Sequence, residues 1–250
     1  MALPKVFIIT ATTASPDLIT NIQSVQAQDY PNLEHVLVCD GKELPASFLP
    51  SQPVHPIQTI LLPWNTGRDR FICHKIYASI PHLLHEPCLV SYLDEDNSLA
   101  PNHVSSLVAT LQAHSYDWVY CLRNIVGPRN NLICRDICES LGNLSPTWPS
   151  LYQGGTDHLV DTSCYLVPVQ ILRQFSECWQ RQARTQPEAD RLFFQQLSRA
   201  YPHYGCSGKF TVNYKIENRP DSVKADFFMM GNSYMRARYE GDVPWDRGAV

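Results

Sequence analysis

Apolar runs and helical spacing alternate along the first part of the chain. Val6 to Ile9 is a continuous apolar run of the kind found in buried parallel strands, and a second run covers His35 to Cys39. Between the two runs, apolar residues recur at helical spacing from Leu18 to Val25. Strand, helix and strand together occupy about 40 residues, which is the size of a parallel crossover unit.

The alternation continues as far as Leu122. It predicts strands over 57–62, 89–93 and 117–122, and helices over 72–83 and 101–113. The resulting order is strand, helix, strand, loop, strand, helix, strand, helix, strand. This order is typical of one half of a doubly wound, Rossmann-like α/β sheet.

Periodicity is weaker in the second part of the chain. Residues 142–156 are rich in Gly, Pro, Ser and Trp, which favours a functional loop. After this loop, the pattern predicts strands from His158 to Val167 and from Phe210 to Ile216, and helices that begin at Pro168 and Pro187. We interpret the tail from residue 226 onward, which mixes aromatic, Met and Arg residues, as a docking arm.

Composition narrows the class of protein. The 250 residues are 44% hydrophobic and 18% charged, which suits one globular domain. The net charge of -4 argues against non-specific nucleic-acid binding, although a small basic pocket for one phosphate group stays compatible with it. The nine cysteines are odd in number and form no CxxC pair, which favours a reducing cytosol over disulfides and argues against a thiolate metal site.

The sequence also bears on the expected location. Met1 to Lys5 leads directly into the first predicted strand, so we expect no signal peptide. We see no run of about 18 apolar residues that could cross a bilayer. The sequence therefore predicts a cytoplasmic protein without an integral membrane segment, and peripheral membrane association stays open.

Three consecutive acids, Asp94-Glu95-Asp96, follow the strand predicted over 89–93. Neighbouring carboxylates repel one another, so a folded protein keeps them partly hydrated or neutralises them with a cation. The carboxyl ends of strands in open α/β sheets are where ligands bind. One interpretation is a divalent-metal site that holds an anionic ligand such as a nucleotide diphosphate. The other is a solvated acidic turn that caps the next helix.

The order and spacing of several short motifs resemble those of the family-2 glycosyltransferases, which have the GT-A fold. The resemblance covers residues 4–113 well and the rest loosely. It rests on Thr10-Ala11-Thr12 after the first strand, the stretch from Ser24 to His35, Asp40-Gly41 after the second strand, Asn65-Thr66-Gly67 after the third, and Asp94-Glu95-Asp96 after the fourth.

This resemblance implies a fold and an activity. The fold would be α/β, with a GT-A-type, Rossmann-like, mixed but mostly parallel sheet and flanking helices in a single domain. Residues 1–122 would bind a nucleotide-diphosphate sugar, residues 123–225 would bind the acceptor and carry catalysis, and residues 226–250 would dock. The activity would be a metal-dependent, inverting transfer of a sugar to the hydroxyl of a glycan or another acceptor.

The resemblance also implies metal and nucleotide ligands. Asp94 and Asp96 would hold Mn²⁺ or Mg²⁺, which prefer oxygen ligands and would neutralise the diphosphate. Glu95 is expected to point away, because successive side chains near a strand end face opposite sides. His203 is a further candidate metal ligand, as a late His contacts the metal or diphosphate in some GT-A enzymes.

The predicted nucleotide pocket draws on the ends of three strands. Asp40 would accept hydrogen bonds from the base or ribose, although it could simply end its strand in a turn with Gly41. Thr10 and Thr12 would line the pocket, or they could be ordinary loop residues. Asn65 and Gly67 match the family motif that follows the third strand.

The chain departs from the family pattern after Gly67. The family has an Arg-Asn pair where this chain has Ile72 and Cys73. The charge that faces the phosphates could come instead from Arg68, Arg70 or His74, each of which could equally lie on a solvated helix face.

An inverting transfer needs a carboxylate that deprotonates the acceptor hydroxyl. The resemblance places this base at the start of a late helix, where Asp190 is the candidate and Glu188 the second choice. Acids in a first helical turn are also favoured by the helix dipole alone. Asp157 and Asp161 are candidates for acceptor contacts, and either could be structural.

Two other functions fit parts of the sequence. A glycan- or nucleotide-binding module that kept the fold and lost catalysis would explain the missing Arg-Asn pair. A nucleotidyltransferase uses a similar sheet and acidic metal site, but it typically has a Gly-rich, basic loop after its first strand. The segment from Thr10 to Ser15 contains neither Gly nor Lys or Arg, which disfavours that enzyme class.

Overall fold

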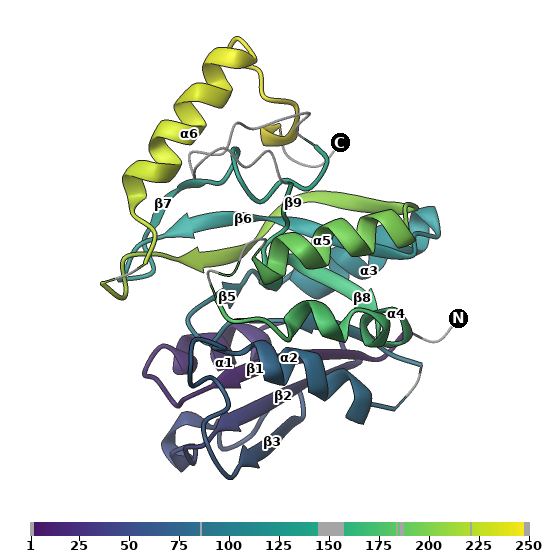
Figure 1. The fold of residues 1–250 in the computed structure, drawn as a ribbon, viewed down its shortest axis with the longest axis vertical. Helices are drawn as coiled ribbons and strands as arrows, with labels where there is room; N and C mark the ends of the chain where they lie inside the picture. Colours follow the sequence, from purple (N-terminus) through teal and green to yellow (C-terminus); the bar gives the residue numbers. More distant parts are fainter. Residues whose placement is uncertain are drawn as a thin grey trace.

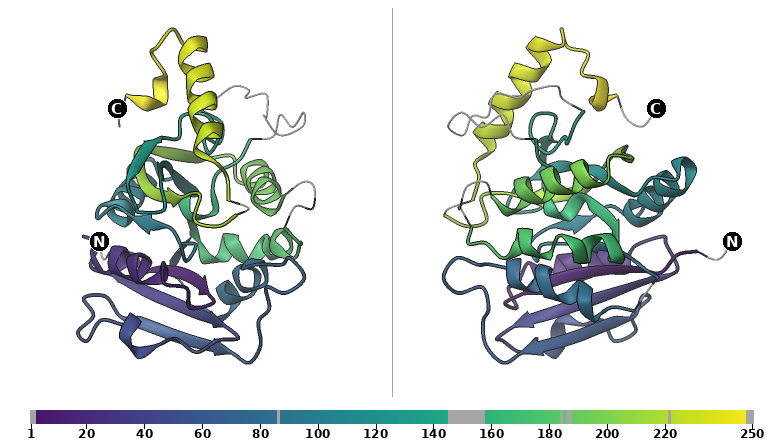
Figure 2. Two further views of the ribbon diagram at one scale, coloured as in Figure 1. Left: turned by 90° about the vertical axis from the view of Figure 1, so that its left-hand side faces the viewer. Right: turned by 45° about the vertical axis from the view of Figure 1, so that its right-hand side comes forward.

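The computed structural model describes residues 3–85, 87–144, 158–183, 185, 188–220 and 222–247. A single mixed sheet runs through the molecule, with helices on both faces (Figure 1). Helices α2, α4 and α5 cover one face, and α1 and α3 cover the other (Figure 2). This α/β arrangement confirms the fold class predicted from the sequence.

The first half of the chain forms the parallel part of the sheet. Strands β1, β2, β3 and β4 lie in the order β3-β2-β1-β4, and each adjacent pair is parallel. The four strands are β1 (Val6–Thr12), β2 (Leu33–Asp40), β3 (Ile57–Leu62) and β4 (Leu89–Tyr92). Every residue of β2 is buried, in agreement with the continuous apolar run, whereas β3 is partly exposed at the edge of the sheet.

The second half departs from a simple doubly wound order. The short strand β8 lies between β4 and β6 and is antiparallel to both, so the strand predicted over 117–122 is not the direct neighbour of β4. Strand β9 then pairs with β6 in parallel. Strand β5 is antiparallel to β9, and β7 is antiparallel to β6. These strands are β5 (Ser98–Leu99), β6 (Trp118–Val126), β7 (Leu132–Arg135), β8 (Tyr165–Pro168) and β9 (Tyr204–Lys215).

Helices α1 to α5 begin within two residues of their predicted starts, whereas α6 lies in the segment interpreted as a docking arm. The helices are α1 (Leu18–Gln26), α2 (His74–Ser79), α3 (His103–His114), α4 (Val169–Gln174), α5 (Ala189–Ala200) and α6 (Ala225–Arg238). Short 3-10 helices cover η1 (Ala46–Phe48), η2 (Ile80–Leu83), η3 (Thr162–Cys164), η4 (Ser176–Trp179) and η5 (Pro244–Asp246). The predicted strand over 158–167 is therefore η3 followed by β8, because Asp161 caps a 3-10 turn by accepting the Ser163 N–H at 2.9 Å.

Three hydrophobic clusters of described residues hold the layers together, and the smallest joins Leu18 and Ile22 of α1 to Leu37 of β2. In the main core, the Trp179 indole packs against Tyr77 and Tyr92, with ring centroids 5.8 Å from each, and so joins η4 to α2 and β4. A second cluster joins β6 to the C-terminal segment.

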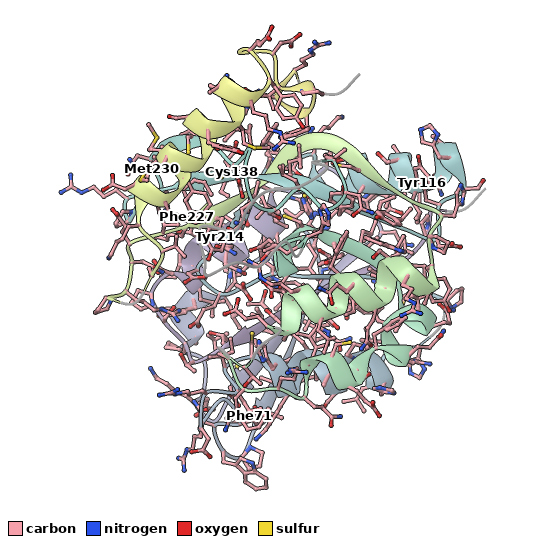
Figure 3. All side chains as sticks on the ribbon, turned by 45° about the horizontal axis from the view of Figure 1, so that its top comes forward. Phe71, Tyr116, Cys138, Tyr214, Phe227 and Met230 are labelled. Atoms are coloured by element: carbon pink, nitrogen blue, oxygen red, sulfur yellow. The ribbon has the colours of Figure 1, made fainter. Side chains whose placement is uncertain are left out.

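The segment interpreted as a docking arm is mostly helical. In α6, Phe228 and Met235 are buried in the second cluster, while Met229 and Met230 are exposed. Figure 3 labels Phe227 and Met230 on this helix, whose Phe228 ring lies 6.5 Å from the Tyr214 ring between centroids. None of the described helices is long and apolar enough to cross a membrane.

Candidate functional site

The candidate site forms where strands β1, β2 and β4 end. Because these strands are parallel, their carboxyl ends meet at one edge of the sheet. Thr12 closes β1, Asp40 closes β2, and the acids from Asp94 to Asp96 follow β4. The apolar runs fix this geometry, since each run ends at the point where the first polar side chains appear.

Asp40 organises the loop that follows β3. Its Oδ1 accepts the backbone N–H of Thr66 at 2.6 Å, and its Oδ2 accepts that of Gly67 at 3.0 Å. Gly41 has a left-handed φ of +74°, and a side chain there would collide with the backbone of Asn65. The structure therefore joins the predicted residues Asp40, Asn65 and Gly67 in one unit, in which both oxygens of Asp40 already accept bonds from the loop.

The loop from Gly67 to His74 has an unusual backbone. Asp69, Arg70 and Ile72 all have positive φ values, and a β-branched residue rarely adopts this conformation. The Ile72 N–H donates to the Gly67 carbonyl at 3.1 Å, which closes the loop. Such strain is often kept at ligand sites. Arg68 and Arg70 are exposed on this loop.

His74 is not on a solvated helix face, which was the alternative interpretation. It is buried, and its Nδ1 lies 2.7 Å from the Arg181 carbonyl oxygen. Burial lowers the pKa of His74, although that hydrogen bond and the nearby charge of Glu188 oppose the shift.

The two predicted threonines differ in their surroundings. Thr10 is fully buried, and its hydroxyl lies 3.0 Å from His35 Nε2, so it packs behind the sheet edge. Thr12 lies at the edge, and its hydroxyl donates to Glu95 Oε2 at 2.7 Å. The Thr13 N–H also donates to that oxygen, at 3.1 Å. Glu95 thus turns back toward the loop after β1.

Asp94 is surrounded by neutral donors. Its Oδ1 accepts the Tyr77 hydroxyl at 2.7 Å and the Cys73 thiol at 3.9 Å. Burial raises the pKa of Asp94 to about 7, and the charges of Asp161 and Asp96 add to this shift. Cys73 occupies one of the two positions where the family resemblance expects the Arg-Asn pair. Asp94 therefore lacks an immediate cation at the position where the family pattern would supply one.

Asp96 contacts the segment that follows β9. Its Oδ2 accepts the Asn218 side-chain N–H at 2.8 Å and lies 3.3 Å from the Arg219 guanidinium. Arg219 also lies 3.5 Å from Glu95, and its side chain is 54% exposed. Burial raises the pKa of Asp96, and the contacts with Asn218 and Arg219 oppose the shift.

The acids can hold a cation only with help from a ligand. Among the described residues, no group of three or more His, Cys, Asp or Glu side chains is arranged to hold a metal ion. Two adjacent carboxylates, Asp94 and Asp96, use oxygen donors that suit Mg²⁺ or Mn²⁺, and these ions usually keep waters or take phosphate oxygens as further ligands. The pair fits an ion shared with a diphosphate and does not form a complete protein cage.

A buried guanidinium lies among a second set of acids. Arg123 on β6 is 3% exposed and ion-pairs with Asp136 at 2.8 Å, Glu139 at 2.6 Å and Asp161 at 2.6 Å. Its guanidinium carbon also lies 4.3 Å from the centroid of the Tyr214 ring. Asp161, a predicted acceptor contact, is therefore bound to Arg123 in a structural network.

Asp136 folds the loop that this network holds. It accepts the backbone N–H groups of Cys138, Glu139 and Ser140 at 2.8–3.1 Å. Burial disfavours its charge, but the Arg123 guanidinium and these hydrogen bonds keep the pKa of Asp136 below its usual value.

Asp190 stands in the first turn of α5. Its Oδ1 accepts the backbone N–H of Arg191 at 2.7 Å. Burial raises the pKa of Asp190 to about 6, with further contributions from the charges of Glu188 and Asp161. Glu188 occupies the N-cap position but makes no side-chain cap hydrogen bond, so capping does not explain that residue. Asp161 thus lies near enough to act electrostatically on both Asp94 and Asp190.

Two further groups complete the surroundings of Asp190. Glu139 lies 3.7 Å from Arg191, and burial raises the pKa of Glu139 to about 7. Tyr165 is buried beside Asp190, and its hydroxyl has no hydrogen-bond partner in the part of the chain that the structure describes. An unpaired buried hydroxyl is uncommon and marks a place where a ligand or water can bind.

His203 is not brought to the acids. It precedes β9, whereas Asn97 and Asp96 bind Lys215 and Asn218, at and beyond the other end of that strand. The twelve residues of β9 lie along the nine residues of β6, so these ends are roughly 26 Å apart at the usual rise. Asp157, the other predicted acceptor contact, lies outside the described residues.

Sequence reasoning missed Arg123, Glu139 and Arg219. Asn218 and Arg219 could have been found, because they follow the strand predicted over 210–216, and the ends of the other strands had already supplied candidates. Arg123 directly follows the strand predicted over 117–122, but its three carboxylate partners are scattered along the sequence, so no local signal marks it.

We compared the chain with known families, sequences and structures. No family model and no curated protein sequence matches the chain. The S. aureus TarS structure matches with a TM-score of 0.59 and 15% identity, covering 85% of this chain and 37% of TarS. TarS 1-349 in complex with UDP-GlcNAc matches with a TM-score of 0.59 and 14% identity, covering 89% of this chain and 60% of that one. TarS 1-349 in complex with UDP matches with a TM-score of 0.55 and 15% identity, covering 85% and 60%.

These matches show a shared fold. The chain spans 60% or less of the TarS chains that it matches, at 14–15% identity. The fold is therefore similar to that of TarS, a glycosyltransferase, over most of this chain.

Proposed function

We propose that this chain is a glycosyltransferase that moves a sugar from a nucleotide-diphosphate donor to an acceptor hydroxyl. One observation carries the proposal. Asp94 and Asp190 are far apart in the sequence, yet both are buried close enough to Asp161 for its charge to add to the rise that burial causes in their pKa values. A metal-and-diphosphate site and a general base would need to be adjacent in this way.

The donor would bind at the ends of the parallel strands. TarS was crystallised with UDP-GlcNAc and with UDP, which supports a nucleotide-diphosphate sugar as the donor of this fold. Asp40 would act mainly by holding the loop of Asn65 and Gly67, since its oxygens bind the backbone of that loop. Arg219 lies beside Asp96 and would contact the diphosphate.

Asp94 and Asp96 would hold Mn²⁺ or Mg²⁺ together with the diphosphate, and the bound ion would neutralise the leaving group. The protein supplies two carboxylates, and the ligand would supply the remaining oxygens. We leave His203 out of this assignment, because it lies at the far end of β9.

Asp190 would accept the proton of the acceptor hydroxyl as that oxygen attacks the anomeric carbon. Attack opposite the departing diphosphate would invert the configuration of the sugar. A pKa of about 6 suits this role, because the carboxylate is largely ionised at neutral pH and is a stronger base than an ordinary aspartate. Glu188 contributes to this shift through its charge, so it would tune the base.

The test combines binding with turnover. A thermal-shift panel of UDP, GDP, dTDP and CDP, with and without Mn²⁺, should show stabilisation by one nucleotide that depends on the ion. Release of that nucleotide from its sugar conjugate should then fall by about 10²- to 10⁴-fold in Asp190→Asn, which is the usual contribution of a general base. Glu188→Gln is the matched control and should change the rate far less.

The outcomes separate the candidate functions. No shift with any nucleotide would overturn the proposed function. Nucleotide binding without turnover would favour the catalytically silent module, which has support in the neutral Cys73 thiol where the family resemblance expects a charged pair. Unchanged turnover in Asp190→Asn would overturn the assignment of the base.

A further inference from the structure

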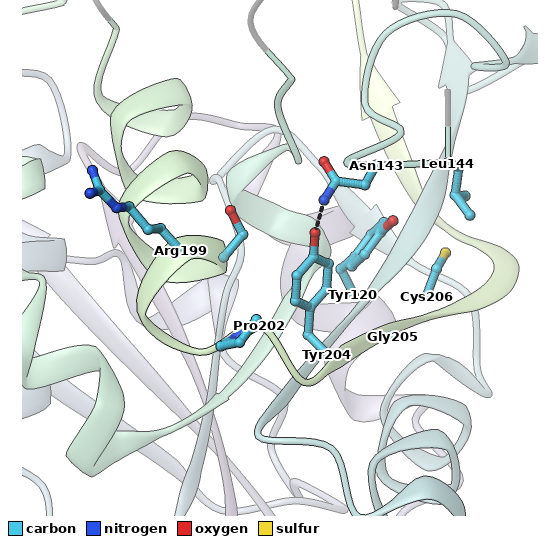
Figure 4. A pocket seen from close by; sticks show the side chains of 9 residues that line it. Tyr120, Asn143, Leu144, Arg199, Pro202, Tyr204, Gly205 and Cys206 are labelled. Carbon is cyan, nitrogen blue, oxygen red and sulfur yellow. Dashed lines mark hydrogen bonds between the residues drawn. The ribbon is translucent and has the colours of Figure 1, made fainter. Parts of the chain in front are cut away.

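A cavity of about 450 Å³ lies outside the cluster of acids. It is bounded by the last turn of α5, the first residues of β9, and the loop around Asn143 (Figure 4). The described lining consists of Tyr120, Asn143, Leu144, Ser198, Arg199, Pro202, Tyr204, Gly205 and Cys206. None of these residues was selected by the sequence motifs, and none takes part in the site described above.

The lining favours a neutral ligand. It contains no carboxylate among its described residues, so it does not suit a metal ion or another cation. Arg199 is its single charged side chain, which is too little to hold a polyanion. Burial raises the pKa of Cys206 to about 12 and also raises the pKa of Tyr204, so both groups stay protonated at neutral pH.

Tyr204 offers a fixed aromatic ring with a polar end. The ring stacks on Trp118, with centroids 4.2 Å apart and planes 15° from parallel, and the edge of Phe194 packs nearby. The Asn143 side-chain N–H donates to the Tyr204 hydroxyl, as Figure 4 shows. An aromatic ring next to amide and hydroxyl groups can contact the apolar face of a sugar ring and hydrogen-bond its hydroxyls.

The cavity lies along the same helix as the proposed base. Asp190, Phe194 and Ser198 follow one another at four-residue spacing, which places them on one side of α5. Eight residues of helix span about 12 Å between Asp190 and Ser198. Tyr120 in the lining is also the cross-strand partner of Tyr165, the tyrosine with the unpaired hydroxyl beside Asp190.

We propose that this cavity binds a neutral sugar residue of the acceptor, so that the acceptor is an oligosaccharide or polysaccharide lying along α5. The reacting hydroxyl would be at Asp190, and a more distant sugar residue of the same molecule would rest against Tyr204. The acceptor role rests on the proposed function, whereas the binding of sugar in the cavity does not.

The binding test uses saturation-transfer NMR on the full chain with four neutral trisaccharides, namely maltotriose, cellotriose, N-acetylated chitotriose and mannotriose. At least one should give transfer signals. Ser198→Trp should abolish them, because the indole fills the cavity. Among the described residues, the Ser198 hydroxyl bonds within its own helix, to the Phe194 and Gln195 carbonyls, so the substitution removes no tertiary hydrogen bond in that part of the chain.

Tyr204→Phe is the milder variant. It keeps the ring on Trp118 and removes the hydroxyl, so affinity should fall about two- to tenfold, as for one neutral hydrogen bond. Tyr234→Ala, on α6 outside the cavity, is the control and should leave the signals unchanged. The proposal is overturned if no trisaccharide gives a signal, or if the signals survive in Ser198→Trp.

A parallel thermal shift with the nucleotide panel separates this proposal from the proposed function. Ser198→Trp should keep the nucleotide shift and lose only the trisaccharide signals. If the chain binds a trisaccharide in the cavity but binds no nucleotide, the sugar site is supported and the glycosyltransferase proposal is overturned.

Discussion

Two buried acids from different parts of the molecule, Asp94 and Asp136, have opposite surroundings. After β4, Asp94 is held by neutral donors, the Tyr77 hydroxyl and the Cys73 thiol, and its pKa is raised to about 7. In the loop after β7, Asp136 is paired with the Arg123 guanidinium, and its pKa is lowered. Both carboxylates are buried, yet one is paired with a cation of the protein and the other is not.

This difference distinguishes a ligand site from a scaffold. A carboxylate that already has an internal cation gains little from binding an external one. A buried carboxylate that has only neutral donors is destabilised by burial when it ionises, and an arriving cation relieves this destabilisation. Asp161 belongs with the scaffold by its contact with Arg123, although its charge reaches Asp94.

The strongest test of this comparison removes the internal cation. Arg123→Met would remove the guanidinium that the carboxylates of Asp136, Glu139 and Asp161 share, so we expect the free energy of unfolding to fall by about 3–5 kcal/mol at neutral pH. Chemical denaturation measures the change. Arg219→Ala is the control, since that guanidinium is half exposed and its loss should cost at most about 1 kcal/mol. Equal effects would contradict the distinction.

A smaller loss is expected where a carboxylate serves backbone donors. Asp40→Ala leaves the N–H groups of Thr66 and Gly67 without their acceptor, which should lower the free energy of unfolding by about 1–3 kcal/mol. Asp40→Asn keeps one carbonyl oxygen and should lose less. Chemical denaturation of both variants measures the two free energies of unfolding. An unchanged free energy of unfolding in Asp40→Ala would mean that the loop holds its conformation without this carboxylate.

The pH dependence of stability tests the opposite treatment of Asp94. Its folded pKa of about 7 exceeds the ordinary value of 3.8, so the native state binds the proton more tightly than the unfolded chain does. The stability from protonated Asp94 is complete below about pH 4 and is lost as the pH rises through 7. Asp94→Asn should therefore gain stability relative to the wild type as the pH rises from 4 to 8.

Subtracting the two stability curves isolates Asp94, because Asp190 and Glu139 contribute equally to both proteins. A difference that stays flat with pH would show that Asp94 ionises normally.

The smallest effect is expected from the hydroxyl that Asp94 accepts. Tyr77→Phe removes one donor to the carboxylate, so the pKa of Asp94 should rise further, with a stability change of about 1 kcal/mol or less. Carbon-13 NMR titration of the Asp carboxyl groups measures the pKa directly. Tyr30→Phe, which loses a hydroxyl bonded to the Pro4 carbonyl far from the site, should leave this titration unchanged.

The parallel half of the sheet was predictable from local pattern. The apolar runs of β1 and β2 and the acids after β4 are each contained in a few consecutive residues, so the ends of the strands could be identified. The motif from Asn65 to Gly67 also contacts Asp40, as their adjacent strands imply. The roles of the individual site residues in nucleotide, metal and proton transfer stay predictions.

The strand order of the second half could not be predicted, because it depends on which strands pair with one another. Strand β8 has four residues, and nothing in its pattern indicates that it separates β4 from β6. The predicted position of His203 near the metal required the start of β9 to face the site, but the strand runs the other way.

The sequence by itself determined where the strands end and which acids lie at those ends, because the length and pattern of an apolar run are local features of consecutive residues. Only the tertiary structure decided which acids are neutralised. Arg123 contacts Asp136, Glu139 and Asp161, which lie up to 38 residues away in the sequence. Cys73 and Tyr77 contact Asp94, although β4 separates them from it in the sequence. The charge state of a buried carboxylate depends on all the groups that face it, and folding alone brings those groups together.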